Sequence, residues 1–295
     1  HIFYKLGLLN NLMPMKNLKP LVSIITPTLN FGQFLEKTIQ SIANQDYDNI
    51  EHIIIDGFST DNTVELLKKY EKKYNLRWVS EKDKSPIDAL DKGLKMAKGE
   101  IIGWCMSDDF YTEGAIKKIV GAFVNNPEID LVFGGCQEFD YKTNKFSIIN
   151  RQDPIAISSI TSDDILCGRT TLYQPSLFYR KSIIEKTGPL NINLKFVADV
   201  DWWIKMLKNG AKAFYIDETI AIIGQHKERG SIKYAAQGIK ECMMLAESYG
   251  RRIPFSLRMS YLRWKHPKIP NLIKKHFPYL FLVISQAIKG LDDNK

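Results

Sequence analysis

The chain has 295 residues, of which 44% are hydrophobic and 25% are charged, so it is long enough to bury a large core and has the composition of a globular protein. Its formal net charge is +8, but residues 251–295 hold ten Lys or Arg and only two Asp, so the rest of the chain is neutral. This distribution argues against a nucleic-acid-binding protein, because one tail holds the whole excess.

From Leu21 to Gly135, short apolar runs alternate with segments whose apolar residues recur at helical spacing. The apolar runs are typical of buried strands, and the periodic segments predict helices. This alternation predicts an α/β fold with a mainly parallel, doubly wound, Rossmann-like sheet and flanking helices. We expect strands over 21–28, 50–58, 76–81, 101–106 and 129–135, and helices over 32–45, 61–74, 88–99 and 112–127.

Polar side chains follow three of these strands. Residues 26–30 end the first strand, Asp56 ends the second, and residues 107–109 end the fourth. Because ligands of parallel α/β sheets bind at the carboxyl ends of the strands, the sequence predicts a site there. The chain has no G-x-G-x-x-G and no G-x-x-x-x-G-K-[ST] run, so neither a dinucleotide-binding turn nor a P-loop is predicted.

Two adjacent aspartates, Asp108 and Asp109, end the apolar run "IIGWCMS" with no Lys or Arg beside them. Like charges repel, and both carboxylates lose water where a strand end is partly buried. Either a divalent cation or the N-terminus of the helix expected from Thr112 would offset this cost. We favour the cation, because a pair of carboxylates exceeds what one helix cap needs.

Five segments resemble the motifs of family 2 glycosyltransferases, in the order and spacing of that family, between Pro20 and Ser231. The resemblance implies a GT-A fold and an inverting transfer of a sugar from a nucleotide-diphosphate sugar to a hydroxyl acceptor, with Mn²⁺ or Mg²⁺ as cofactor. In such a reaction a cation stabilises the leaving diphosphate and a base activates the hydroxyl. The segments are VSIITPTLN, HIIIDGFSTDNT, SEKDKSPIDALDKGLKMAKGEIIGWCMSDD, QPSLFYRKSIIEKTGPLNINLKFVADVDWWIKMLKNG and QHKERGS.

By this resemblance, Asp109 falls at the metal ligand of the family's DxD-type motif, and Asp108 either contacts the ribose or supports the metal ligand from behind. His226 matches a histidine that in some relatives lies near the diphosphate or the metal, and a lone surface histidine is the alternative. Relatives often have an arginine two residues before this histidine, where the present chain has Gly224.

The resemblance also assigns nucleotide contacts. Asp56 matches the aspartate that contacts the base, and Phe58 stands where relatives have a small residue, which narrows the base or ribose site. Capping of a helix is an equally good interpretation of Asp88. The nucleotide-binding residues implied are Thr26, Pro27, Thr28, Asp56, Asp88 and Asp108, the first three through backbone groups.

The catalytic base is expected in the segment ADVDWW. Its register makes Asp199 the base and Asp201 a neighbouring carboxylate on the acceptor side, and a shift in register would exchange the two. Gln174, in the segment QPS, and Trp202 are further acceptor-side candidates, although a core position is the commoner role of such a tryptophan. No Ser-His-Asp or Cys-His arrangement competes with this assignment.

Four regions are expected: an N-terminal extension over 1–19, a nucleotide-sugar-binding half over 20–135, an acceptor-side half with the base over 136–235, and a basic helical C-terminal appendage over 236–295. The basic aromatic segment 251–295 suits either peripheral contact with an anionic membrane or packing as a helical cap. Four dispersed cysteines without a CxxC pair predict a reduced, cytoplasmic protein. The basic tail adds the expectation of a peripheral position on the inner face of the membrane. Residues 1–14 do not read as a signal peptide.

The predicted function is therefore that of a metal-dependent inverting hexosyltransferase in surface polysaccharide or glycan biosynthesis. The expected donor is a UDP-sugar, because this is the commonest donor of such enzymes, and a glycan or lipid-linked acceptor is expected. Two other classes stay open. A nucleotidyltransferase would carry a Gly-rich basic loop after the first strand, which TPTLNFGQ lacks. A nucleotide-sugar-binding protein without turnover is disfavoured by the presence of both Asp109 and Asp199.

Overall fold

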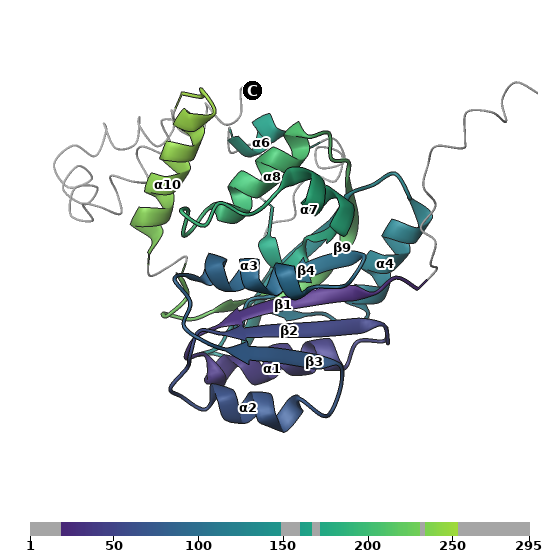
Figure 1. Ribbon diagram of the computed structural model, residues 1–295, viewed down its shortest axis with the longest axis vertical. Helices are drawn as coiled ribbons and strands as arrows, with labels where there is room; N and C mark the ends of the chain where they lie inside the picture. Colours follow the sequence, from purple (N-terminus) through teal and green to yellow (C-terminus); the bar gives the residue numbers. More distant parts are fainter. Residues whose placement is uncertain (1–18, 149–159, 167–171, 231–233, 253–295) are drawn as a thin grey trace, which may run out of the picture. The chain divides into compact units, whose positions relative to one another are not determined.

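Figure 1 shows the computed structural model of the chain, which describes residues 19–148, 160–166, 172–230 and 234–252. Its contacts divide the chain into two units, His1–Asn193 with Ala198–His226 and Leu194–Val197 with Lys227–Lys295. The sheet lies entirely in the first unit. The domain boundaries at 135 and 235 stay a prediction.

Four parallel strands form one half of the sheet in the order β3-β2-β1-β4. In chain order they are β1 (Val22–Thr28), β2 (Ile50–Asp56), β3 (Leu76–Ser80) and β4 (Ile101–Trp104). All seven residues of β1 and of β2 are buried, as expected for strands covered on both faces. Thr28 pairs with Asp56, so these two strands end side by side. The α/β fold with a parallel core expected from the sequence is confirmed.

The other half of the sheet is mixed. Beyond β4 the order continues β8-β6-β9-β5, and β7 pairs with β6. Strands β6 and β9 are parallel to each other, whereas β8, β5 and β7 pair antiparallel with their neighbours. The new elements are β5 (Phe110–Tyr111), β6 (Leu131–Asp140), β7 (Lys145–Ile148), β8 (Phe178–Arg180) and β9 (Ala213–Gln225).

Helices cover both faces of this sheet (Figure 1). Ile24 of β1 packs in a core with α1 (Gly32–Ala43) and α4 (Ala115–Asn125), and α2 (Thr63–Tyr70) packs on β2 on that same face. The next residue, Ile25, faces α3 (Pro86–Met96) and α8 (Ala198–Lys208) on the opposite face, because successive side chains of a strand alternate between faces. The remaining described elements of this unit are α6 (Ser162–Leu166), η1 (Gln174–Ser176) and α7 (Lys181–Thr187).

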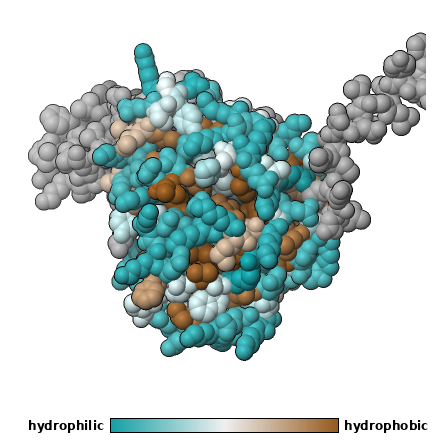
Figure 2. Space-filling view, viewed as in Figure 1, coloured by the Kyte–Doolittle hydropathy of each residue, from teal (hydrophilic) through white to brown (hydrophobic). Residues whose placement is uncertain are grey.

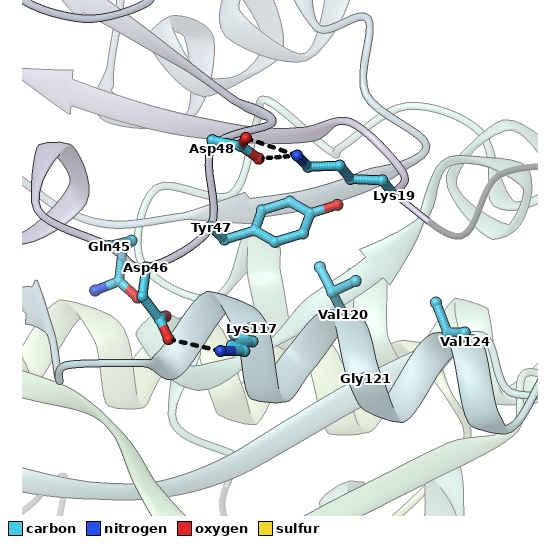
Figure 3. Close-up of a pocket in the computed structure, with 9 residues that line it drawn as sticks. All are labelled: Lys19, Gln45, Asp46, Tyr47, Asp48, Lys117, Val120, Gly121 and Val124. Carbon is cyan, nitrogen blue, oxygen red and sulfur yellow. Dashed lines mark hydrogen bonds and ion pairs between the residues drawn. The ribbon is translucent and has the colours of Figure 1, made fainter.

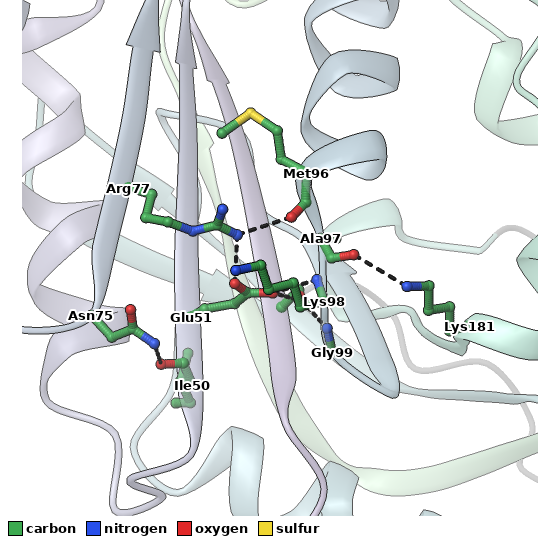
Figure 4. A network of polar contacts seen from close by, with 10 residues as sticks. Ile50, Glu51, Asn75, Arg77, Met96, Ala97, Lys98, Gly99 and Lys181 are labelled. Carbon is green, nitrogen blue, oxygen red and sulfur yellow. Dashed lines mark hydrogen bonds and ion pairs between the residues drawn. The ribbon is translucent and has the colours of Figure 1, made fainter.

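A buried carboxylate fixes the amino edge of the sheet (Figure 4). Glu51 accepts hydrogen bonds from the Ser23 hydroxyl (2.5 Å) and the Lys98 N–H (2.6 Å) and forms an ion pair with Arg77 (2.6 Å). The Gly99 N–H donates to the Ser23 oxygen at 2.8 Å. These contacts hold the turn between α3 and β4 against the first two strands.

The second unit contains α10 (Ala235–Ser248). The buried side chain of Glu241 on this helix accepts hydrogen bonds from the N–H groups of Lys195 (3.0 Å) and Phe196 (2.8 Å). The Phe196 ring lies 5.3 Å from the ring of Tyr234. Residues 253–295, which hold most of the basic tail, and residues 1–18 lie outside the described residues.

Figure 2 shows a largely hydrophilic face, with smaller hydrophobic areas between the polar side chains. Among the helices that the structure describes, none has the length and apolar character that a membrane span requires.

Candidate active site

The two adjacent aspartates form a tight turn directly after β4. The turn is closed by a hydrogen bond from the Asp109 N–H to the Met106 carbonyl, at 3.0 Å. The buried Thr38 hydroxyl of α1 lies 2.6 Å from the Asp109 carbonyl oxygen and 3.0 Å from that of Ser107. Both aspartates are buried, at 7% and 4% exposure for Asp108 and Asp109. This turn is therefore a rigid, water-poor place for two carboxylates.

Strand β9 brings a third polar group to this turn. The Gly224 N–H donates to Asp109 Oδ1 at 2.9 Å, and His226 Nε2 lies 2.9 Å from Asp108 Oδ2. A Cβ on Gly224 would lie only 2.1 Å from the Asp108 carbonyl oxygen. The backbone of β9 therefore passes too close to the turn for any side chain at this position.

His226 lies among aromatic rings. Its ring stacks on Phe34 at a centroid distance of 4.1 Å, with Phe31 and Tyr141 at 5.6 and 5.9 Å. The side chain is 7% exposed, and Nδ1 is buried with no hydrogen-bond partner among the described residues. If Nε2 carries the proton, its N–H donates to the Asp108 carboxylate, and the lone pair of Nδ1 is left for a ligand. His226 is thus no simple surface histidine.

The first two strands end beside one another at the same edge of the sheet. The Thr26 hydroxyl is hydrogen-bonded to buried His52 at 2.9 Å, whereas the Thr28 hydroxyl is buried and has no partner in the described structure. Pro27 lies between them in β1. Both carboxylate oxygens of Asp56 accept hydrogen bonds. The donors are the N–H and the hydroxyl of Ser59 and the hydroxyl of Ser80, the last at 2.6 Å.

Asp88 lies in the first turn of α3. The N-cap of this helix is Ser85, whose hydroxyl accepts from the Asp88 N–H, while Asp88 Oδ2 accepts from the Lys84 N–H at 3.0 Å. The Ser85 hydroxyl thus caps the helix, and the Asp88 carboxylate holds the N–H of the residue that precedes this cap. The described contacts of Asp88 are those of a helix cap together with an ion pair to Lys92 at 3.8 Å.

The two aspartates of α8 have different surroundings. Asp201 is buried and forms an ion pair with Lys205 one turn later, at 2.7 Å. Asp199 is partly exposed, and its Oδ1 accepts a hydrogen bond from the Val200 N–H at 2.9 Å. Burial raises the pKa of Asp199 to about 6, against the opposing effect of that hydrogen bond. Of the two, Asp199 has the properties of a base that works near neutral pH.

The remaining acceptor-side candidates are anchored to the end of β4. Gln174 Nε2 donates to the Trp104 carbonyl at 2.8 Å, and Trp202 stacks on the Trp104 ring at 5.6 Å. Trp202 is 1% exposed and donates its N–H to the Gly188 carbonyl, so it is a core residue with no open face for an acceptor. It fastens the first turn of α8, which carries Asp199, to the strand that leads into the aspartate turn.

A surface groove lies elsewhere, between the loop before β2 and α4 (Figure 3). Its rim carries two ion pairs, Lys19 with Asp48 at 2.5 Å and Lys117 with Asp46 at 3.2 Å. Because Lys19 and Asp48 precede β1 and β2, this groove is at the amino edge of the sheet, away from the polar strand ends. Within the residues described, no three His, Cys, Asp or Glu side chains are grouped so as to hold a metal ion.

The chain belongs to glycosyltransferase family 2, whose model, Glycosyl transferase family 2, matches residues 23–188. An uncharacterized glycosyltransferase of Rickettsia felis is 28% identical over 240 residues, which are 80% of this chain and 39% of the relative. The chain thus spans about two fifths of the length of that relative. TuaG of Bacillus subtilis, named for teichuronic acid biosynthesis, is 27% identical over 216 residues, 70% of this chain and 80% of TuaG.

Solved structures of glycosyltransferases share the fold. Staphylococcus aureus TarS in complex with UDP-GlcNAc matches with a TM-score of 0.61 at 22% identity, over 77% of this chain and 66% of that one. The mannosyltransferase PcManGT of Pyrobaculum calidifontis, in complex with GDP-Man and Mn²⁺, matches with a TM-score of 0.61 at 17% identity, over 92% of this chain and 81% of that one. The GT-A type fold expected from the sequence is confirmed.

Sequence reasoning missed several parts of the site. Thr38 carried no motif, and Gly224 was read only as a missing arginine. Asp83, in the loop after β3, was not singled out, although one of its carboxylate oxygens is buried without a hydrogen-bond partner in the described structure. The signal for β9 was available in the β-branched run of AFYIDETIAIIGQ.

Proposed function

We propose that this chain transfers a sugar from a nucleotide-diphosphate sugar to a hydroxyl acceptor, with inversion at the anomeric carbon. The observation that carries the proposal is the buried aspartate turn after β4, because it joins polar groups of α1, β4 and β9 at the carboxyl edge of the sheet. Two buried carboxylates at such a place suit a cationic partner, which the diphosphate of a donor would also need.

The residues present fit Mn²⁺ or Mg²⁺. Both ions prefer oxygen ligands and are often held by one or two carboxylates together with phosphate oxygens of the substrate. Asp109 would hold the ion through its carboxylate, and Nδ1 of His226, which has no hydrogen-bond partner among the described residues, would bind the ion or the diphosphate. When bound, the cation supplies stabilisation of the charge on the leaving diphosphate.

Asp199 is the proposed base. A single inverting displacement needs one group that accepts the acceptor's proton, and an aspartate with its pKa raised to about 6 is ionised at neutral pH yet basic enough for this task. Trp202, one turn later on α8, stacks on Trp104 at the end of β4 and so holds this helix near the aspartate turn. Asp201 is neutralised by Lys205 and serves to fix the helix.

The relatives support the setting of the reaction. TuaG is named for teichuronic acid biosynthesis, and TarS and PcManGT were solved with UDP-GlcNAc and GDP-Man. We therefore propose a role in polysaccharide biosynthesis with a UDP-sugar donor and a glycan or lipid-linked acceptor. The division into a donor half over 20–135 and an acceptor half over 136–235, and peripheral membrane contact through 251–295 on the cytoplasmic face, belong to this proposal.

Thermal unfolding with UDP and GDP, with and without Mn²⁺, tests the donor site. A ligand at a hundredfold excess over its Kd adds about 2.7 kcal/mol to the free energy of unfolding. We expect a Mn²⁺-dependent increase in Tm that Asp109→Asn abolishes and that Asp46→Asn, at the amino edge, leaves unchanged. The absence of any nucleotide effect in the wild type would overturn the proposal.

A further inference from the structure

Helix α1 turns one face toward the aspartate turn. Phe34, Lys37 and Thr38 recur at the spacing that places side chains on the same face of a helix. Phe34 stacks on the ring of His226, and the Thr38 hydroxyl is hydrogen-bonded to carbonyl oxygens of the aspartate turn. Lys37 lies between these two residues and brings a charge to this face of the helix.

The ammonium group of Lys37 lies among three aromatic rings. Its Nζ is 3.5 Å from the ring centroid of Phe139, 4.6 Å from that of Phe110 and 5.7 Å from that of Tyr141. Burial lowers the pKa of Lys37, and in the part of the chain that the structure describes no carboxylate forms an ion pair with it. The negative faces of the rings therefore supply the attraction that a carboxylate would otherwise give.

The three rings contact one another beside the aspartate turn. The centroid of Phe139 lies 5.7 Å from that of Phe110 and 5.1 Å from that of Tyr141. Phe110 directly follows Asp109 in the chain, and the Tyr141 hydroxyl donates to the Asp108 carbonyl at 3.0 Å. Two of the three rings are thus joined to the aspartate turn, one through the backbone and one through a hydrogen bond.

The same rings border the part of β9 that leads to His226. Phe139 pairs with Gly224 where β6 and β9 run in parallel, and the Tyr141 N–H donates to the Gln225 carbonyl at 3.1 Å. The ring of Tyr141 lies 5.9 Å from that of His226. The ring cluster therefore borders both segments that form the candidate metal and diphosphate site.

The charge of Lys37 adds something that an apolar side chain of the same size would not. A cation is attracted by the face of each aromatic ring near it, and this attraction increases where water is excluded. The lysine is on α1, whereas the rings are on β5 and β6 or follow β6 directly. The attraction therefore resists movement of either strand away from the helix.

We propose that Lys37 is a positioning residue of the candidate active site. Its ammonium group holds the three rings against α1, and the rings in turn keep the aspartate turn and the ring of His226 in the arrangement that binds the donor diphosphate with its cation. The inference rests on the proposed function and deepens it, because it adds a residue that acts on the site through the framework around it.

Hydrogen exchange of the ligand-free protein tests the positioning itself. Lys37→Met keeps an unbranched side chain but removes the charge, whereas Lys37→Arg keeps a cation that the rings also attract. We expect peptides that cover residues 107–111 and 222–226 to exchange at least about threefold faster in Lys37→Met, and at the wild-type rate in Lys37→Arg. Equal exchange in all three proteins would overturn the inference.

Calorimetry with UDP and GDP in the presence of Mn²⁺ tests the consequence for the site. We expect Lys37→Met to raise the Kd of the nucleotide that binds about fivefold, and Lys37→Arg to stay within about twofold of the wild type. The matched control is Lys73→Met, which removes an ammonium group 4.6 Å from the ring of Tyr70 at the end of α2 and should leave Kd unchanged. A lower Tm of Lys37→Met without a change in Kd would show that Lys37 only stabilises the fold, and the inference would fail.

The outcomes separate this inference from the proposed function. If the wild type binds neither UDP nor GDP, the proposed function fails, and hydrogen exchange alone decides whether Lys37 positions the aspartate turn. If the wild type binds a nucleotide and Lys37→Met binds it equally well, the assignment of Lys37 is overturned while the proposed donor site stands.

Discussion

The pH dependence of sugar transfer follows from the surroundings of Asp199. Burial raises its pKa to about 6 from an ordinary value of 3.8, because the protein replaces the water that stabilises the ionised carboxylate. Only the ionised form accepts a proton from the acceptor hydroxyl. With a pKa of about 6, nearly all of the enzyme is active at pH 7.5, but only about one tenth is active at pH 5.

We therefore expect kcat/KM for the donor and acceptor pair to fall about tenfold between pH 7.5 and pH 5, with an inflection near pH 6. The assay measures initial rates of transfer as a function of pH, in buffers of constant ionic strength. At each pH, a separate measurement confirms that the protein stays folded. Asp201→Asn should keep the inflection whatever its maximal rate, because Asp201 is paired with Lys205. A profile that is flat down to pH 5, or an inflection near the ordinary pKa of 3.8, would refute the argument from burial.

Three further predictions concern the framework of the site. His52 is fully buried, and burial lowers its pKa to about 3, so below pH 6.5 the unfolded chain binds one more proton than the folded chain. Lowering the pH from 7.5 to 5.5 should therefore cost the wild type about 1.4 kcal/mol of unfolding free energy that His52→Gln does not lose. Urea unfolding at both pH values measures this loss, and an equal loss in the two proteins would contradict the prediction. Thr38→Val removes the hydroxyl that donates to the aspartate turn and should weaken Mn²⁺-dependent UDP binding about fivefold. Thr38→Ser keeps a hydroxyl and should restore the affinity. Equal binding by the wild type and both variants would show that the hydroxyl is dispensable. Glu51→Ala leaves the Lys98 N–H without this acceptor and removes the carboxylate partner of Arg77, which keeps its bond to the Met96 carbonyl. The variant should lower the free energy of unfolding by about 3 kcal/mol, and a loss below about 1 kcal/mol would mean that the network in Figure 4 relaxes.

The parallel half of the fold was predictable because its signals are local. Each strand from β1 to β4 is a short apolar run, and each following helix has its own apolar period, as in Ile39 and Ile42 of α1. The helix bounds moved by a few residues where caps decide them: α3 begins at Pro86 because Ser85 is its cap, whereas the periodic pattern begins at Asp88.

The mixed half was not predictable in this way. Strand β5 has two residues and β8 has three, which is too short for any period to appear, and both exist because longer neighbours supply their hydrogen bonds. The pairing of β6 with β9 joins segments that are far apart in the chain. It is this pairing that carries Gly224 and His226 to the aspartate turn.

The same limit applies to the site. The sequence predicted Asp108, Asp109 and Asp199 from motif and strand ends, and these residues do lie at the end of β4 and at the start of α8. It placed His226 near the diphosphate or the metal, which stays a prediction, and it gave no sign of the hydrogen bond between this ring and Asp108. It had no means to show that Asp56 is satisfied and that Asp83 is not, because hydrogen-bond satisfaction depends on three loops that meet only in the folded sheet.

The most direct test of the account compares sugar transfer with nucleotide affinity in Asp199→Asn. The amide keeps the shape of the carboxylate but accepts no proton, and general bases contribute about 10² to 10⁴ in rate. The account predicts a loss of transfer in that range, with Kd for the nucleotide and Mn²⁺ changed by less than about threefold. Transfer at the wild-type rate would show that Asp199 is not the base, and an equal loss of transfer and affinity would show that it belongs to the donor site instead.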